Sequence, residues 1–292
     1  MAMITTNDHH YHAIANAIRE NAGTDRTYKP EEMPLGVGHA YSAGFACGYN
    51  MGVEDGETNG KNISNQWWID FIKGKTNLDG FFKEGKFETI PDGLDFSNVT
   101  SMGQTFYTCS NLKRLPFINS TNCTYFGYAF GGIGQVSNPL DEVLIDMRSA
   151  TDTEQILGSA KVYKWKLLGD LRGVKNAANM TVWSAVAEIR AYEDETMAVE
   201  IPLDLSSNTK TSVFAYNNSL RYVRVAPGSI KVSQNVGAAN LLEDGTIQSI
   251  IDGLADLTGA TAQTLTLHAD VGAKLTQAQK DAVSAKNWTL VY

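Results

Sequence analysis

Three histidines near the amino terminus are the first residues whose type and spacing could do chemistry. They form the pattern HHxH, with His9, His10 and His12. Clustered imidazoles can bind Zn²⁺ or Ni²⁺, and three copies of one histidine could meet on the axis of a symmetric trimer. The simpler interpretation is a solvated first helical turn. We therefore predict no metal site and no cofactor.

Two groups of acidic residues could be interpreted as the paired carboxylates of a glycosidase. One group consists of Asp141, Glu142 and Asp146, and the other spans residues 193–195. Both lie in or beside strand-like runs, where a solvated face is the simpler interpretation. The chain has no GxSxG, HExxH or GK[ST] motif, and the glycines at 131–134 indicate a turn after a helix. We predict that the protein is not an enzyme.

Tyrosine and tryptophan side chains near the strand-like runs are candidates for a binding surface, because these residue types are enriched at interfaces and their rings stack on sugar rings. The candidates are Tyr107, Tyr125, Tyr128, Tyr163, Trp165, Tyr192 and Tyr222. Packing in the core or between repeats is the alternative for half or more of them. The sequence alone therefore assigns none of them to a ligand.

Composition narrows the class of protein. The 292 residues include 43% hydrophobic and 19% charged residues, which is enough apolar material for a sizeable core. The net charge of −8 disfavours a general role in binding nucleic acid or anionic lipid. The three cysteines, Cys47, Cys109 and Cys123, are too few and too widely spaced for a disulfide framework or a CxxC metal site. We expect them to be small buried residues.

Residues 1–65 are predicted to be a helical region for attachment or oligomerisation. The start has no basic segment followed by an apolar run, so we expect no secretory signal peptide. Residues 35–53 carry no Asp, Glu, Lys or Arg, and this segment has small residues at every fourth position. These small residues are Gly36, Ala40, Gly44, Gly48 and Gly52. Such spacing lets helices approach closely and favours a homo-oligomer, with a trimer suspected. The alternatives are an irregular glycine-rich segment and a membrane span, and the polar and glycine content disfavours the span.

The rest of the chain alternates between strand-like and helix-like runs. Residues 66–86, with the apolar cluster WWIDFI, are predicted to cap the first repeat. From residue 87, strand-like runs recur about every 23–30 residues. They lie at 87–91, 112–117, 140–147, 162–168, 186–193, 220–227, 263–269 and 288–292. Helical or turn segments are expected at 101–109, 122–130, 152–159, 179–186 and 210–217. Their predicted core residues are Phe106, Phe126, Phe130, Ile156, Leu157, Trp183 and Phe214.

Residues 95–130 resemble the irregular leucine-rich repeats of bacterial BspA-like surface proteins. The motif F-x-x-C-x-x-L-x-x-L is matched by Phe106, Cys109, Leu112 and Leu115, and the match weakens in later units. The segment from 241 onward, with predicted helices at 246–257 and 276–285, resembles a closing unit. The resemblance implies an α/β repeat fold over 87–292, an irregular leucine-rich-repeat solenoid with a strand sheet on one side and short helices on the other.

The amino-terminal pattern HAIANAIRENAGTDRTYKPEEMP resembles the start of leucine-rich-repeat proteins encoded in phages and prophages of gut Firmicutes. Those proteins are regarded as tail-associated or host-surface-binding. The resemblance implies a receptor-binding protein of the virion, with a host cell-surface glycan or protein and other tail proteins as partners. The alternative is a bacterial cell-surface adhesin or an interaction scaffold. A third hypothesis is a carbohydrate-active enzyme. We expect no nucleic-acid partner and no membrane span.

Overall fold

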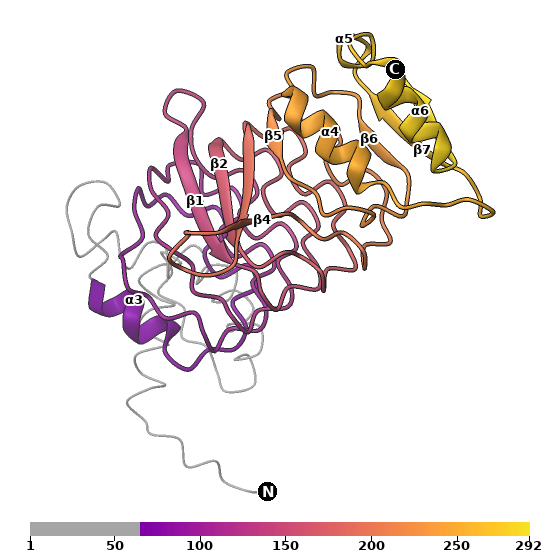
Figure 1. Cartoon of the computed structure of the whole chain (residues 1–292). Coiled ribbons are helices and arrows are strands. Elements are labelled where there is room, and N and C mark those ends of the chain that lie inside the picture. The colour runs from indigo at the N-terminus through magenta and orange to yellow at the C-terminus, as the bar shows by residue number, and fades with distance from the viewer. Residues whose placement is uncertain (1–64) are drawn as a thin grey trace, which may run out of the picture. The chain divides into compact units, whose positions relative to one another are not determined.

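The computed structural model describes residues 65–292 (Figure 1). The predictions for the histidine cluster His9, His10 and His12, for Cys47, and for the small-residue series lie outside the described residues. That series comprises Gly36, Ala40, Gly44, Gly48 and Gly52. Within residues 65–292, no helix is both long enough and apolar enough to cross a membrane.

The described residues form two sheets and four helices. The first sheet contains β1 (Leu140–Asp146), β2 (Val162–Leu168), β3 (Glu188–Tyr192), β4 (Glu200–Ile201) and β5 (Tyr222–Val223). The second contains β6 (Gln234–Val236), β7 (Gln263–Leu267) and β8 (Trp288–Val291). The helices are α3 (Asn65–Ile72), α4 (Asp244–Gly253), α5 (Ala269–Gly272) and α6 (Gln277–Ala285).

The first sheet is mixed. Strands β1, β2, β3 and β5 pair in parallel and in that order, whereas β4 pairs with β3 in antiparallel orientation. Val143, Trp165, Ile189 and Val223 are aligned across these strands and are all buried. Residues one position earlier point to the other face, because side chains alternate along a strand. That alternation places the polar row Glu142, Lys164, Glu188 and Tyr222 on the outer face.

The second sheet is parallel and is packed beside amphipathic helices. Helix α4 buries Ile247, Ile250 and Ile251, which recur at helical spacing. Helix α6 begins with a capping box in which the Thr276 hydroxyl accepts from the Gln279 backbone N–H and the Gln279 side chain accepts from the Thr276 N–H. Both helices lie close to the ranges predicted from the sequence.

Six stretches of the chain form turns that stack on one another, and we call them the turn ladder. They span residues 77–85, 101–109, 125–133, 152–160, 176–184 and 209–217, and Figure 1 shows the successive turns stacked beside one another. Backbone N–H groups of one stretch donate to carbonyls of the next. Phe106 N–H donates to Ala129 O at 2.8 Å, and Phe130 N–H donates to Ile156 O at 2.9 Å. The ladder therefore satisfies its backbone groups between passes of the chain, as a sheet does.

Left-handed residues explain why these stretches are turns and not the predicted helices. Each of these stretches has two residues with positive φ, four positions apart, and an α-helix cannot include either of them. The pairs include Gln104 and Thr108, Gln155 and Ser159, and Asn179 and Trp183. The predicted leucine-rich-repeat solenoid with helices opposite a strand sheet is therefore wrong. The described residues have mixed parallel and antiparallel sheets and only a few short helices.

An aromatic stack fills the inside of the ladder. Phe82, Phe106 and Phe130 are buried, and their ring centroids are 5.3 and 5.5 Å apart in nearly parallel planes. The buried Trp68 of α3 lies 4.6 Å from the Phe82 ring and covers the end of this stack. Consecutive passes thus share one apolar interior, and burial of such rings is a major source of stability.

Candidate functional site

The structure separates the aromatic candidates into exposed and internal residues. Trp165 is fully buried in β2, so it cannot contribute to a surface. Tyr125 is 41% exposed, and Tyr107 and Tyr128 are half-buried. Trp183, predicted to be a core residue, is instead 64% exposed. That prediction is wrong because Trp183 has a left-handed backbone, with φ of 53°, and does not lie on the inner face of a helix.

Trp183 pairs with a second exposed ring that no sequence pattern singled out. Tyr216 is 57% exposed, and its ring centroid lies 6.0 Å from that of Trp183. The two residues belong to adjacent passes, because Trp183 N–H donates to Tyr216 O at 3.2 Å. Tyr216 also has a left-handed φ, of 56°. The repeated backbone geometry thus presents two large rings side by side at the surface.

A tyrosine cluster lies on earlier turns of the same ladder. The rings of Tyr107 and Tyr128 meet edge to face, with centroids 6.0 Å apart. Gln155 Nε2 donates to the Tyr128 hydroxyl at 2.8 Å. Lys83 Nζ lies 5.4 Å from the Tyr107 ring centroid and donates to Gln104 Oε1 at 3.1 Å. Both rings are therefore held in place while part of each remains accessible.

The Tyr125 ring lies close to the backbone at two glycines. A Cβ added at Gly103 would clash with the Tyr125 ring, and one added at Gly127 would lie 2.5 Å from its hydroxyl oxygen. The Asp79 carboxylate is beside Gly103, since its Oδ1 accepts from the Gly103 N–H at 2.6 Å. These two glycines are therefore required for close approach of the ring to the backbone. We use the name aromatic face for the set of exposed and half-buried rings that the turn ladder presents, which are Tyr107, Tyr125, Tyr128, Trp183 and Tyr216.

Three carboxylates surround Tyr125. Burial raises the pKa of its phenol, and the negative charges of Asp152, Asp79 and Glu154 raise that pKa further. Asn176 Nδ2 donates to Asp152 Oδ2 at 3.0 Å and to Glu154 Oε2 at 3.1 Å. Within the described part of the chain, no Lys, Arg or His forms an ion pair with any of these three carboxylates. Among residues 65–292, these carboxylates thus accept hydrogen bonds but have no basic partner.

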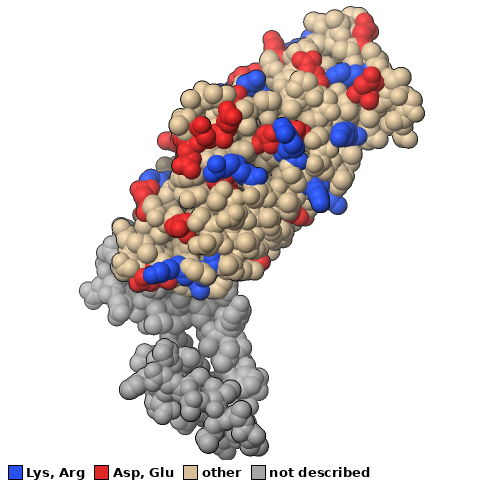
Figure 2. All heavy atoms as spheres, turned by 60° about the horizontal axis from the view of Figure 1, so that its bottom comes forward, with Lys and Arg blue, Asp and Glu red and all other residues tan. Residues whose placement is uncertain are grey.

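On the outer face of the first sheet, unlike around Tyr125, charged side chains form ion pairs with one another. Lys166 Nζ lies 2.7 Å from Glu142 Oε2. Arg190 contacts Glu188 and Glu200, each at 2.8 Å. Figure 2 shows acidic and basic side chains next to one another on the face that it draws. This sheet face has few charges left to attract a ligand.

Two further aromatic candidates lie on this sheet face. Tyr222 packs under Arg190, whose guanidinium carbon is 4.0 Å from the ring centroid. The Tyr222 hydroxyl donates to Glu200 Oε1 at 2.5 Å. Burial, followed by this hydrogen bond and the Glu200 charge, raises the pKa of Tyr222 to about 12. Tyr222 and Tyr192, which is half-buried in β3, therefore belong to the sheet and not to the aromatic face.

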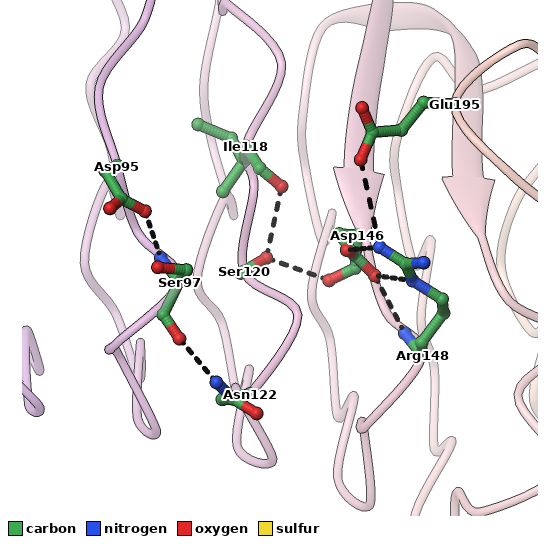
Figure 3. A network of polar contacts seen from close by, with 8 residues as sticks. All are labelled: Asp95, Ser97, Ile118, Ser120, Asn122, Asp146, Arg148 and Glu195. Atoms are coloured by element: carbon green, nitrogen blue, oxygen red, sulfur yellow. Dashed lines mark hydrogen bonds and ion pairs between the residues drawn. The ribbon is translucent and has the colours of Figure 1, made fainter.

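The predicted acidic groups have structural roles. Asp141 and Glu142 are exposed, but Asp146 is fully buried, so its expected place on a solvated face is wrong. Asp146 accepts from Arg148 Nε at 3.0 Å and from an Nη at 2.5 Å (Figure 3). Arg148 reaches Glu195 at 3.9 Å and connects β1 to the loop after β3. A charged group is tolerated inside here because it is paired and hydrogen-bonded.

Figure 3 also shows hydrogen bonds that stabilise the turns next to Asp146. The Ser120 hydroxyl donates to the backbone oxygen of Asp146 at 2.8 Å, and Asn122 Nδ2 donates to Ser97 O at 2.7 Å. Asp95 accepts from Ser97 N–H at 2.9 Å, and its pKa is lowered by the hydrogen bonds from Ser97. The bonds donated by Ser120 and Asn122 connect successive passes of the chain. The residues drawn include no converging pair of free carboxylates.

Two polar residues of one cleft and the side chain of His268 serve to cap helices. The cleft, of about 390 Å³, is lined by Asp244, Ile247, Lys274, Leu275, Thr276 and Gln279. Two of its polar residues, Thr276 and Gln279, already form the cap of α6. His268 caps α5, because its Nδ1 accepts from Asp270 N–H at 3.2 Å. Among residues 65–292, no group of three or more His, Cys, Asp or Glu side chains is arranged to hold a metal ion.

Comparison of the chain with protein-family models, with curated proteins and with solved structures gave no match. The relationship to BspA-like proteins thus stays a prediction from sequence, and the aromatic face must be interpreted from its own chemistry.

Proposed function

We propose that this chain is a non-enzymatic binding protein associated with a phage or prophage tail, and that its aromatic face binds a glycan of the host surface. The observation that carries the proposal is the exposed pair Trp183 and Tyr216, with ring centroids 6.0 Å apart. Large exposed aromatic groups on an otherwise polar surface are typical of interaction sites.

Sugar rings fit this surface because one side of a pyranose consists mainly of C–H groups, which pack against an aromatic ring. The hydroxyl groups at the rim of the sugar need hydrogen-bond partners. Amide side chains near the tyrosine cluster can supply these partners. They belong to Gln104, Gln155 and Asn176. A rigid backbone reduces the entropy lost on binding. The turn ladder holds these side chains on neighbouring passes.

The binding proposal is tested by screening the full chain against an array of bacterial-surface glycans. The strongest ligand is then titrated by calorimetry with Trp183→Ala, Tyr216→Ala and the double variant. We expect each single change to weaken binding about tenfold, which corresponds to about 1.4 kcal/mol. Tyr163→Ala is the matched control, because Tyr163 is an exposed tyrosine on β2, outside the aromatic face. Unchanged affinity in the double variant, or no glycan bound at all, contradicts the proposal.

The proposed location in the virion is tested separately. Induction of a lysogen that carries the gene releases particles whose proteins can be identified by mass spectrometry. We expect the chain in purified particles, in a fixed ratio to known tail proteins. Its presence in the cell envelope and absence from particles would favour a cell-surface adhesin instead.

A further inference from the structure

The aromatic face has an electrostatic asymmetry that sugar stacking alone does not require. Three carboxylates lie at its Tyr125 end. Asp79 binds the N–H of Gly103, against which the Tyr125 ring packs. Asp152 forms a parallel bridge with Tyr125, and Glu154 shares the Asn176 amide with Asp152. Within residues 65–292 no basic side chain forms an ion pair with any of the three. On the first sheet, by contrast, lysine and arginine side chains pair with their neighbouring carboxylates. Three carboxylates without an ion pair to a described residue therefore lie next to the exposed tyrosine.

The Tyr125 ring is also fixed in orientation. The ring packs closely against the backbone at Gly103 and Gly127. The residue nevertheless remains 41% exposed. An aromatic ring attracts a cation over its face, and nearby carboxylates add to that attraction. The ring and the carboxylates thus both favour a cationic group on the ligand.

Lys83 is a basic side chain close to the tyrosine cluster, and its contacts are defined. It lies over Tyr107 and donates to Gln104. It has no ion pair with the carboxylates around Tyr125. An anionic sugar polymer would meet three negative charges at Tyr125, whereas an ammonium group would find both the ring and the carboxylates.

We propose that the Tyr125 end of the aromatic face selects glycans that carry a protonated amino group over neutral or anionic glycans of the same backbone. This inference rests on the proposed glycan binding and adds the class of ligand. The ammonium would lie against the exposed Tyr125 ring, with Asp152 and Glu154 as its counter-charges. The adjacent sugar rings would stack on the other rings of the face.

Two oligosaccharides with one backbone give a direct test. The probes are β-1,4-linked oligomers of glucosamine and of N-acetylglucosamine, of equal length, titrated into the full chain at pH about 6, where carboxylates are ionised and the amines are protonated. We expect the glucosamine oligomer to bind about tenfold or more tightly. This preference should shrink as salt is added, because salt screens charge attraction at an exposed site.

Variants assign the preference to named residues. The double variant Asp152→Asn/Glu154→Gln keeps hydrogen-bonding groups of the same size and should reduce the preference to near onefold, with N-acetylglucosamine binding unchanged. Asp141→Asn, which removes an exposed carboxylate from β1, is the matched control and should keep the preference. If the double variant does not fold by circular dichroism, Tyr125→Leu replaces it, since that change removes the aromatic ring and leaves all three carboxylates.

The outcomes separate this inference from the proposed function. Equal or tighter binding of the N-acetylated oligomer overturns the amine selectivity and leaves glycan binding intact. A preference for the amine that survives both the double variant and Tyr125→Leu also overturns it. Failure of both oligomers and of every glycan on the array overturns the proposed function, and the inference with it.

Discussion

Trp183→Gly should weaken glycan binding about tenfold and leave the fold intact. Trp183 is 64% exposed, so about a third of its surface is in contact with the rest of the protein. Its φ of 53° lies in the left-handed region, which a bulky residue adopts only at a cost and glycine adopts freely. The substitution therefore removes a ring from the surface and also relieves the strain of the backbone that presents it.

The expected change in stability follows from three contributions. A buried third of a side chain of roughly 250 Å² contributes about 2 kcal/mol at ~25 cal/mol/Å². Release of the left-handed conformation returns about 1–2 kcal/mol. Glycine's greater freedom in the unfolded chain costs about 0.5–1 kcal/mol. The free energy of unfolding should therefore fall by only about 1 kcal/mol.

Urea denaturation of the full chain measures this difference, and calorimetry with the array ligand measures binding. Phe106→Ala is the control for a core ring. Phe106 is fully buried between Phe82 and Phe130, and its truncation should cost about 3–5 kcal/mol. A loss of similar size for Trp183→Gly would refute the reasoning, because it would place Trp183 in the core, where the sequence pattern predicted it.

Two further predictions concern groups whose pKa is raised. The pKa of the Cys109 and Cys123 thiols is raised from 9.0 to about 12, mainly by burial. Iodoacetamide at pH about 8 should therefore leave both thiols unlabelled in the native protein and label them after unfolding, as measured by peptide mass spectrometry. The pKa of Tyr222 is raised from 10.0 to about 12, so its contribution to stability is complete below pH about 10 and is lost as the pH rises toward about 12. Glu200→Gln should move the ultraviolet titration of Tyr222 part of the way back toward its ordinary value, because burial remains. An unmoved titration would contradict the contribution assigned to Glu200.

Six of the eight strands in the described residues, and the helices α4 and α6, could be predicted from sequence because their signals are local. The short strands β4 and β6 lie outside the predicted runs. Strands β1 and β2 fall within or on the predicted ranges, where apolar side chains recur at strand spacing. Helices α4 and α6 are short amphipathic segments next to polar cap residues. The run at 87–91 forms only a single bridge, between Thr89 and Arg114, because turns dominate that part of the chain.

The turn ladder could not be predicted in this way. Its left-handed positions hold Gln104, Tyr128, Gln155 and Trp183, which are residue types that normally avoid positive φ. Apolar residues three or four apart suggested helices, but buried side chains have the same spacing in these turns. Bonds between passes fix these conformations, and the residues of one pass carry no sign of them. The exposure of Trp183 follows from that long-range pairing.

The same pairing determines how a ligand would meet the aromatic face. Tyr107 and Tyr128 lie on adjacent passes, and so do Trp183 and Tyr216. Because each pass hydrogen-bonds to the next, both ring pairs are aligned with the stacking of the turns and not with the direction of the chain. A compact ligand would contact one pair. A polymer long enough to reach from one pair to the other would contact both, and two weak contacts on one support give an affinity greater than either alone. The turn ladder therefore suits a polymeric surface glycan better than a free monosaccharide.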